Sequence, residues 1–124
     1  MMVLRILIAD DEPLFAEALE ALLGVDQRIE VVGRALDGTQ AIELARKLDP
    51  DVVLMDLSMP GVNGFGATEQ ILAEDGDTHI LVLSGSDDPA DIAKARDAGA
   101  AGYITKDRIA ERLVEAILAA AELP

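Results

Sequence analysis

Five short runs of apolar residues recur along the chain, and a longer segment with helical spacing follows each of them. The third run, residues 51–56, is the clearest, because four consecutive apolar residues form its centre without alternation. A strand covered by helices on both faces has this pattern. The runs predict five strands, at residues 4–9, 29–33, 51–56, 80–83 and 103–105.

Between the strands, apolar residues spaced three or four apart predict five helices. The first helix begins at Pro13, which suits a first helical turn, and ends near Gly24. The other helices are expected at residues 41–48, around 67–73, through 92–98 and over 109–120. Strands that alternate with helices in this way predict an α/β fold, with a parallel sheet covered on both faces.

Composition narrows the possible functions. The 124 residues carry 10 Lys and Arg against 24 Asp and Glu, and the resulting net charge of −14 disfavours binding to nucleic acids or anionic membranes. With no cysteine and one histidine, His79, the chain has no disulfides, thiolate metal sites or multi-histidine metal sites. No apolar run is long enough to cross a membrane and the N-terminus lacks a signal-peptide pattern, so a cytoplasmic location is expected.

Polar side chains stand at the carboxyl ends of four predicted strands, where open α/β sheets bind their ligands. These side chains are Asp10 and Asp11, Asp56, Ser84, and Lys106. Two carboxylates within about 5 Å repel each other by roughly 3–4 kcal/mol at an effective dielectric near 20, so a cluster of them calls for a cation. Oxygen ligands without His or Cys favour Mg²⁺, and an aspartate beside Mg²⁺ can act as a nucleophile toward a phosphoryl group. Taken singly, Asp10 and Asp11 could cap the first helix, and Asp56, Ser84 and Lys106 are better explained as ordinary turn or loop residues; their joint placement favours a site.

Four segments carry a resemblance to a known family: ILIADDEPLF, DVVLMDLSMPGVNG, ILVLSGSDD and AGAAGYITKD. The sequence resembles the receiver domain of a bacterial two-component response regulator, and its ending GYITKD resembles the LuxR/NarL-type subfamily. The resemblance implies a flavodoxin-like (βα)5 three-layer sandwich with a parallel sheet of strand order 2-1-3-4-5. It also implies phosphorylation on aspartate by a sensor histidine kinase.

Carried over residue by residue, the resemblance implies that Asp56 is the phosphoacceptor. Asp11 corresponds to the carboxylate that binds Mg²⁺ directly, and Asp10 to the one that acts mostly through water. The backbone carbonyl of Ser58, two residues after Asp56, would complete the metal ligands. Mg²⁺ is the implied cofactor, and Mn²⁺ or Ca²⁺ can substitute for it.

The remaining site residues are implied to hold the phosphoryl group and to report its presence. Ser84 matches the hydroxyl that meets the phosphoryl group, and Lys106 matches the phosphate-binding lysine. Tyr103 matches the aromatic residue that turns inward when Ser84 engages the phosphate. The face formed by the fourth helix, the fifth strand and the fifth helix is implied to change as a result, because the added charge biases a two-state equilibrium.

The resemblance also bears on domains and partners. Residues 1–121 are expected to form the receiver domain and residues 122–124 to begin a linker to a C-terminal output domain. DNA binding is expected only through a helix-turn-helix in that output domain, which would regulate transcription, and phosphorylation is expected to favour a homodimer. Apart from phosphoryl transfer to itself and loss of that group, no enzymatic activity is expected.

Two alternatives come from other classes of protein. A phosphatase or phosphotransferase of the haloacid-dehalogenase type also uses an aspartate at a strand end, but it needs a second aspartate where Ser58 stands. A pseudo-receiver would signal by protein contact without taking phosphate. The complete set of acids, with Ser84 and Lys106, disfavours the pseudo-receiver.

Overall fold

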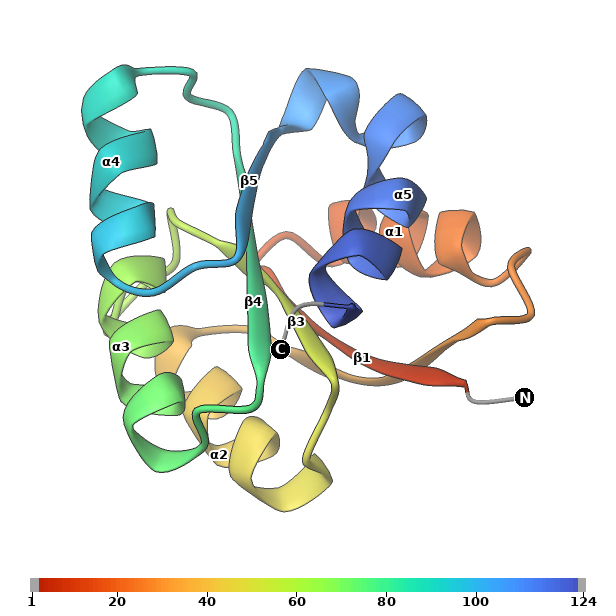
Figure 1. Ribbon diagram of the computed structural model, residues 1–124, viewed down its shortest axis with the longest axis horizontal. Coiled ribbons are helices and arrows are strands. Elements are labelled where there is room, and N and C mark those ends of the chain that lie inside the picture. Colours follow the sequence, from red (N-terminus) through yellow and green to blue (C-terminus); the bar gives the residue numbers. More distant parts are fainter. Residues whose placement is uncertain (1–2, 123–124) are drawn as a thin grey trace.

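A computed structural model describes residues 3–122, in which five strands alternate with five α-helices (Figure 1). All strand pairs are parallel, and the sheet has the order β2-β1-β3-β4-β5, as predicted. The strands are β1 (Leu4–Ala9), β2 (Ile29–Ala35), β3 (Val52–Asp56), β4 (His79–Ser84) and β5 (Gly102–Thr105).

The helices form two layers around the sheet. Helices α1 and α5 pack on one face, and α2, α3 and α4 pack on the other (Figure 1). The structure is therefore the three-layer sandwich that the sequence predicts. The helices are α1 (Pro13–Leu23), α2 (Gly38–Leu48), α3 (Gly64–Glu74), α4 (Pro89–Asp97) and α5 (Ile109–Ala121).

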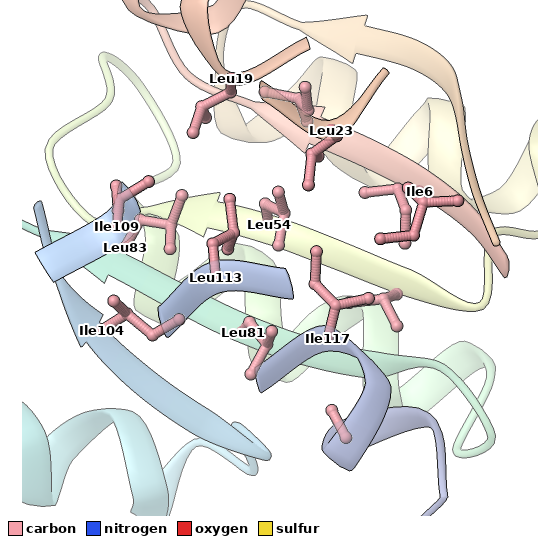
Figure 2. Packing of buried hydrophobic residues seen from close by; sticks show 14 of the residues in the cluster. Ile6, Leu19, Leu23, Leu54, Leu81, Leu83, Ile104, Ile109, Leu113 and Ile117 are labelled. Atoms are coloured by element: carbon pink, nitrogen blue, oxygen red, sulfur yellow. The ribbon is translucent and has the colours of Figure 1, made fainter. Parts of the chain in front are cut away.

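Each face of the sheet has its own apolar core. In the core under α1 and α5, Leu19 and Leu23 face Leu113 and Ile117 across residues of the central strands (Figure 2). All five residues of β3 are buried, which explains why this strand shows no alternation of apolar and polar residues. Burial of the central strands on both faces fixes the carboxyl edge of the sheet, where the polar residues gather.

Helix α3 begins at Gly64, three residues before the predicted start. A Cβ atom at Gly64 would lie 2.4 Å from the carbonyl oxygen of Asp56, so only glycine allows the helix to start against the end of β3. The side chain of Asn63 caps the helix by accepting a hydrogen bond from the amide of Gly66. The two glycines that weaken the helical pattern thus stand where close packing and a cap support the helix.

Other boundaries also differ from the predicted ones. Strand β2 continues to Ala35, and its pairing with β1 shifts register between Ile6 and Leu7. A 3₁₀ turn, η1 (Lys106–Arg108), joins β5 to α5 and has no apolar pattern of its own that would predict it. Of the predicted linker at residues 122–124, Glu122 follows the end of α5, and residues 123–124 lie outside the described residues. Among the described helices, none is long and apolar enough to span a bilayer.

Candidate functional site

Three carboxylates meet at the carboxyl edge of the sheet. Asp10 and Asp11 follow β1, and Asp56 ends β3, which is the neighbour of β1 in the sheet. One oxygen from each of the three lies within 4.8 Å of the others. The structure thus brings together the three acids that the sequence singles out. This is the single group of three or more His, Cys, Asp or Glu side chains with metal-binding spacing within residues 3–122.

Two of these acids are buried and one is exposed. Asp10 and Asp56 are 1% and 3% exposed, whereas Asp11 faces solvent. Burial raises the pKa of the Asp56 carboxyl above its ordinary value, although the charge of Lys106 and a hydrogen bond from the Ser58 amide act against this rise. Burial also raises the pKa of Asp10, against a hydrogen bond from the amide of Glu12. Both carboxylates are therefore costly to ionise without a nearby cation.

Lys106 supplies positive charge to this cluster. Its Nζ lies 3.5 Å from Oδ2 of Asp10, 3.6 Å from Oδ1 of Asp56 and 3.9 Å from Oε1 of Glu12. The ammonium group also lies 4.3 Å from the centre of the Phe15 ring in α1, a cation–π distance. Lys106 comes from the end of β5, two strands away from β3, and its long side chain reaches back to the acids.

Phe15 and Glu12 are site residues that the sequence did not reveal. The apolar spacing of the first helix assigns Phe15 to the core, and the structure does pack it there, half-buried. The same ring also contacts Lys106, which lies 91 positions further along the chain. No local sequence pattern predicts such a contact. Glu12 stands out only as the acid that ends the run Asp10-Asp11-Glu12.

Ser58 lies in the loop after β3, and its side chain is exposed. Its amide donates a hydrogen bond of 3.3 Å to Oδ1 of Asp56 and so helps to orient that carboxylate. The role expected for its carbonyl, as a metal ligand, stays a prediction.

The two predicted switch residues lie on neighbouring strands, and both contact the loop after β4. Ser84 is buried, and its Oγ accepts a hydrogen bond of 3.0 Å from the amide of Ser86. Tyr103 is half-buried, and its hydroxyl donates a hydrogen bond of 2.7 Å to the carbonyl of Ser86. Within the described residues, no hydrogen bond joins Ser84 to Asp56 or Lys106. Ser86 is thus a further residue of the site region.

The donor set fits a hard divalent cation. All three clustered side chains offer oxygen, and the buried pair places negative charge where water screens it poorly. One exposed carboxylate leaves an open approach for a ligand from solvent. Such a site can hold Mg²⁺ together with an anionic group that also contacts Lys106.

Comparisons with known proteins agree with this geometry. The family model described as the response regulator receiver domain matches residues 6–118. The nitrate/nitrite response regulator NarP of Escherichia coli K12 is 44% identical over 119 residues, which cover 95% of this chain and 55% of NarP. The transcriptional regulatory protein DegU of Brevibacillus brevis is 40% identical over 119 residues, covering 96% of this chain and 50% of DegU.

The structural neighbours agree with the sequence relatives. The signal receiver domain of the response regulator NarL from Mycobacterium tuberculosis superposes with a TM-score of 0.95 at 35% identity, over 100% of both chains. The response regulator domain of Thermotoga maritima CheB superposes with a TM-score of 0.92 at 31% identity, over 98% of both chains.

The chain belongs to the family of response regulator receiver domains. Within two-component signalling it is of the LuxR/NarL type, which confirms the resemblance seen in the sequence. The chain spans about half the length of the full-length relatives NarP and DegU.

Proposed function

We propose that this domain is a phosphorylation-dependent switch in which Asp56 accepts a phosphoryl group from a sensor histidine kinase. The observation that carries the proposal is the buried Asp56 carboxylate, which lies beside two further aspartates and 3.6 Å from the Lys106 ammonium. In the transfer, an oxygen of Asp56 forms the new bond to phosphorus while the P–N bond of the phosphohistidine breaks and the imidazole leaves.

Asp11, Asp56 and the Ser58 carbonyl would hold Mg²⁺, with Asp10 acting mostly through water; Mn²⁺ or Ca²⁺ can take the same place. A divalent cation bound there supplies positive charge that offsets the charge of the phosphoryl oxygens. The amide of Ser58 holds Oδ1 of Asp56 in position, so the other oxygen is free to attack. Lys106 is placed to meet a phosphoryl oxygen on Asp56, because its Nζ already contacts that carboxylate.

The readout of phosphorylation involves Ser84 and Tyr103. Ser84 ends β4 directly after Leu83, the register partner of Asp56 in β3, and its hydroxyl would turn toward a phosphoryl group on Asp56. Tyr103 would follow that movement and change the surface formed by α4, β5 and α5. This surface would control a DNA-binding output domain, and homodimerisation would accompany the change. A cytoplasmic location and regulation of transcription are part of the same proposal.

We further propose that the domain has no enzymatic activity toward a separate substrate. A haloacid-dehalogenase type phosphatase needs an acid two residues after the nucleophile, and the exposed Ser58 occupies that position. Absence of turnover of a generic phosphomonoester, measured by released phosphate, is the expected result.

Phosphorylation by acetyl phosphate tests the main proposal. The protein incubated with acetyl phosphate and Mg²⁺ is expected to gain the mass of one phosphoryl group, and the gain should disappear with EDTA and in Asp56→Asn. Asp97→Asn is the matched control, because Asp97 is an exposed aspartate at the end of α4. Undiminished labelling of Asp56→Asn, or equal loss in both variants, contradicts the assignment of Asp56.

A further inference from the structure

Ser86, in the loop between β4 and α4, takes part in four hydrogen bonds. Its amide donates to Oγ of Ser84 at 3.0 Å, and its carbonyl accepts from the hydroxyl of Tyr103 at 2.7 Å. Its own hydroxyl donates to Oδ2 of Asp91 at 2.7 Å and accepts from the amide of Asp88 at 3.1 Å. One residue therefore contacts both predicted switch residues through its backbone and the start of α4 through its side chain.

Helix α4 is weakly anchored by apolar packing. Ala95 is the one buried residue among the nine residues of this helix. The side chain of Asp88 caps the helix by accepting from the amide of Ala90 at 2.9 Å. With so little buried surface, polar contacts of the first turn make up a large share of what holds α4 in place.

The contact with Asp91 ties this first turn to the loop after β4. Asp91 is the third residue of α4, where the helix dipole favours a negative charge. A hydrogen bond to a charged carboxylate stabilises more than one between neutral groups. Without the Ser86 hydroxyl, both Asp91 and the amide of Asp88 lose their partner in the loop.

We propose that Ser86 is a positioning residue that links the hydroxyl of Ser84 to the first turn of α4. The inference rests on the proposed function, in which a phosphoryl group on Asp56 attracts Ser84. When Oγ of Ser84 moves toward Asp56, it either draws the Ser86 amide along or breaks the hydrogen bond to it. In both cases the Ser86 hydroxyl shifts relative to Asp91, and the first turn of α4 is released.

Hydrogen exchange of the α4 amides measures this link without phosphorylation. In the unmodified protein, Ser86→Ala, Asp91→Ala and Ser84→Ala are each expected to raise the exchange rate of α4 by about threefold to tenfold, the effect of losing about one hydrogen bond. Ser84→Ala is expected to add nothing when Ser86→Ala is already present, because its effect passes through Ser86.

Conservative variants separate this role from general destabilisation. Ser86→Thr and Asp91→Asn keep a donor and an acceptor, and α4 should exchange in them as in the unmutated protein. Asp87→Ala, at an exposed neighbour in the same loop, should also leave the exchange of α4 unchanged. The urea midpoint of each variant shows whether the whole domain is destabilised, in which case exchange would rise in α1 and α5 as well.

The phosphorylated protein provides the second measurement. After incubation with acetyl phosphate and Mg²⁺, α4 of the unmutated protein should exchange at the rate of the unmodified Ser86→Ala variant, and Ser86→Ala should change little further. Additive effects of Ser84→Ala and Ser86→Ala, or an unchanged α4 in Ser86→Ala, overturn the proposal. Absence of any phosphoryl uptake by the unmutated protein would contradict the proposed function instead, while the exchange rates of the unmodified variants still decide whether Ser86 links Ser84 to α4.

Discussion

At the scale of single residues, the site consists of charges that the fold holds at a cost. Asp10 and Asp56 are almost fully buried, and their burial raises the pKa of both carboxyl groups. Lys106 offsets part of this cost, but it is shared among three acids at 3.5–3.9 Å. Without a bound cation, the protein is therefore expected to be less stable at neutral pH than a variant with fewer buried carboxylates.

We expect Asp56→Asn to be more stable than the unmutated protein in EDTA at pH 7, by on the order of 1 kcal/mol. The pKa of Asp56 is higher in the folded than in the unfolded state, so the free energy of unfolding falls as the pH rises from the unfolded-state pKa to the folded-state pKa. Below the unfolded-state pKa both states are protonated and this penalty is absent. The advantage of Asp56→Asn should thus shrink as the pH falls toward 4.

Urea unfolding at a series of pH values measures this difference. Glu69→Gln, at an exposed position on α3, serves as the control for the loss of one negative charge from the surface. If both variants are stabilised equally, the gain comes from the lower net charge and not from the burial of Asp56.

At the scale of the elements, the close approach of α3 to the end of β3 positions Asp56, the proposed phosphoacceptor. Gly64 is buried against the backbone of Asp56 and Leu57, with an added Cβ at 2.4 Å and 2.8 Å from their atoms. Because both neighbours are backbone atoms, neither can move aside without displacing the strand end.

Gly64→Ala is expected to destabilise the domain by about 2 kcal/mol or more and to slow phosphorylation by acetyl phosphate, since it displaces the backbone that carries Asp56. Gly66→Ala is the matched control in the same helical turn. Its Cβ would meet the side chains of Val62, at 3.3 Å, and Asn63, at 3.8 Å, and no backbone of β3, and alanine favours the helix. Equal urea midpoints for the two variants would show that the close contact between Gly64 and Asp56 does not restrict the residue at position 64.

The elements differ in how well the sequence predicts them. The strands and their order follow from apolar runs and family motifs, and the predicted limits of β3 agree with the observed ones to within one residue. The predicted start of α3 is three residues late because Gly64 and Gly66 lower the helical propensity of this segment. Glycine is needed at position 64 for close contact with β3, and the amide of Gly66 is capped by Asn63 in the loop before the helix. The three acids were predictable from strand ends, but the contact of Phe15 with Lys106 and that of Ser86 with Tyr103 join residues far apart in the chain, so no local pattern contains them.

At the scale of the whole molecule, the net charge of −14 and the acidic cluster act in the same direction. Both favour the uptake of cations, one by long-range attraction and the other by direct ligation. The two effects can be separated because monovalent salt screens the first and does not replace the second.

Mg²⁺ is expected to stabilise the folded protein by about 2.7 kcal/mol at 100 times its dissociation constant, because only the folded chain brings the ligands together. Thermal unfolding in MgCl₂, compared with NaCl of equal ionic strength, measures the effect. Asp11→Asn should lose most of the stabilisation by Mg²⁺, and this variant should fold normally because Asp11 is exposed. The same rise in melting temperature in NaCl, or in Asp11→Asn, would indicate charge screening without a bound ion.

The single buried residue of α4 has a consequence for how such domains diversify. Apart from Asp91, whose carboxylate contacts Ser86, the other positions of this helix are released from the constraints of the core, so substitutions there carry little thermodynamic penalty. The carboxyl edge of the sheet, by contrast, follows central strands whose last residues are buried, and it tolerates few changes. A cell that contains many receivers can therefore keep one chemistry in all of them and give each a distinct outer helix, which limits unwanted crosstalk between parallel pathways.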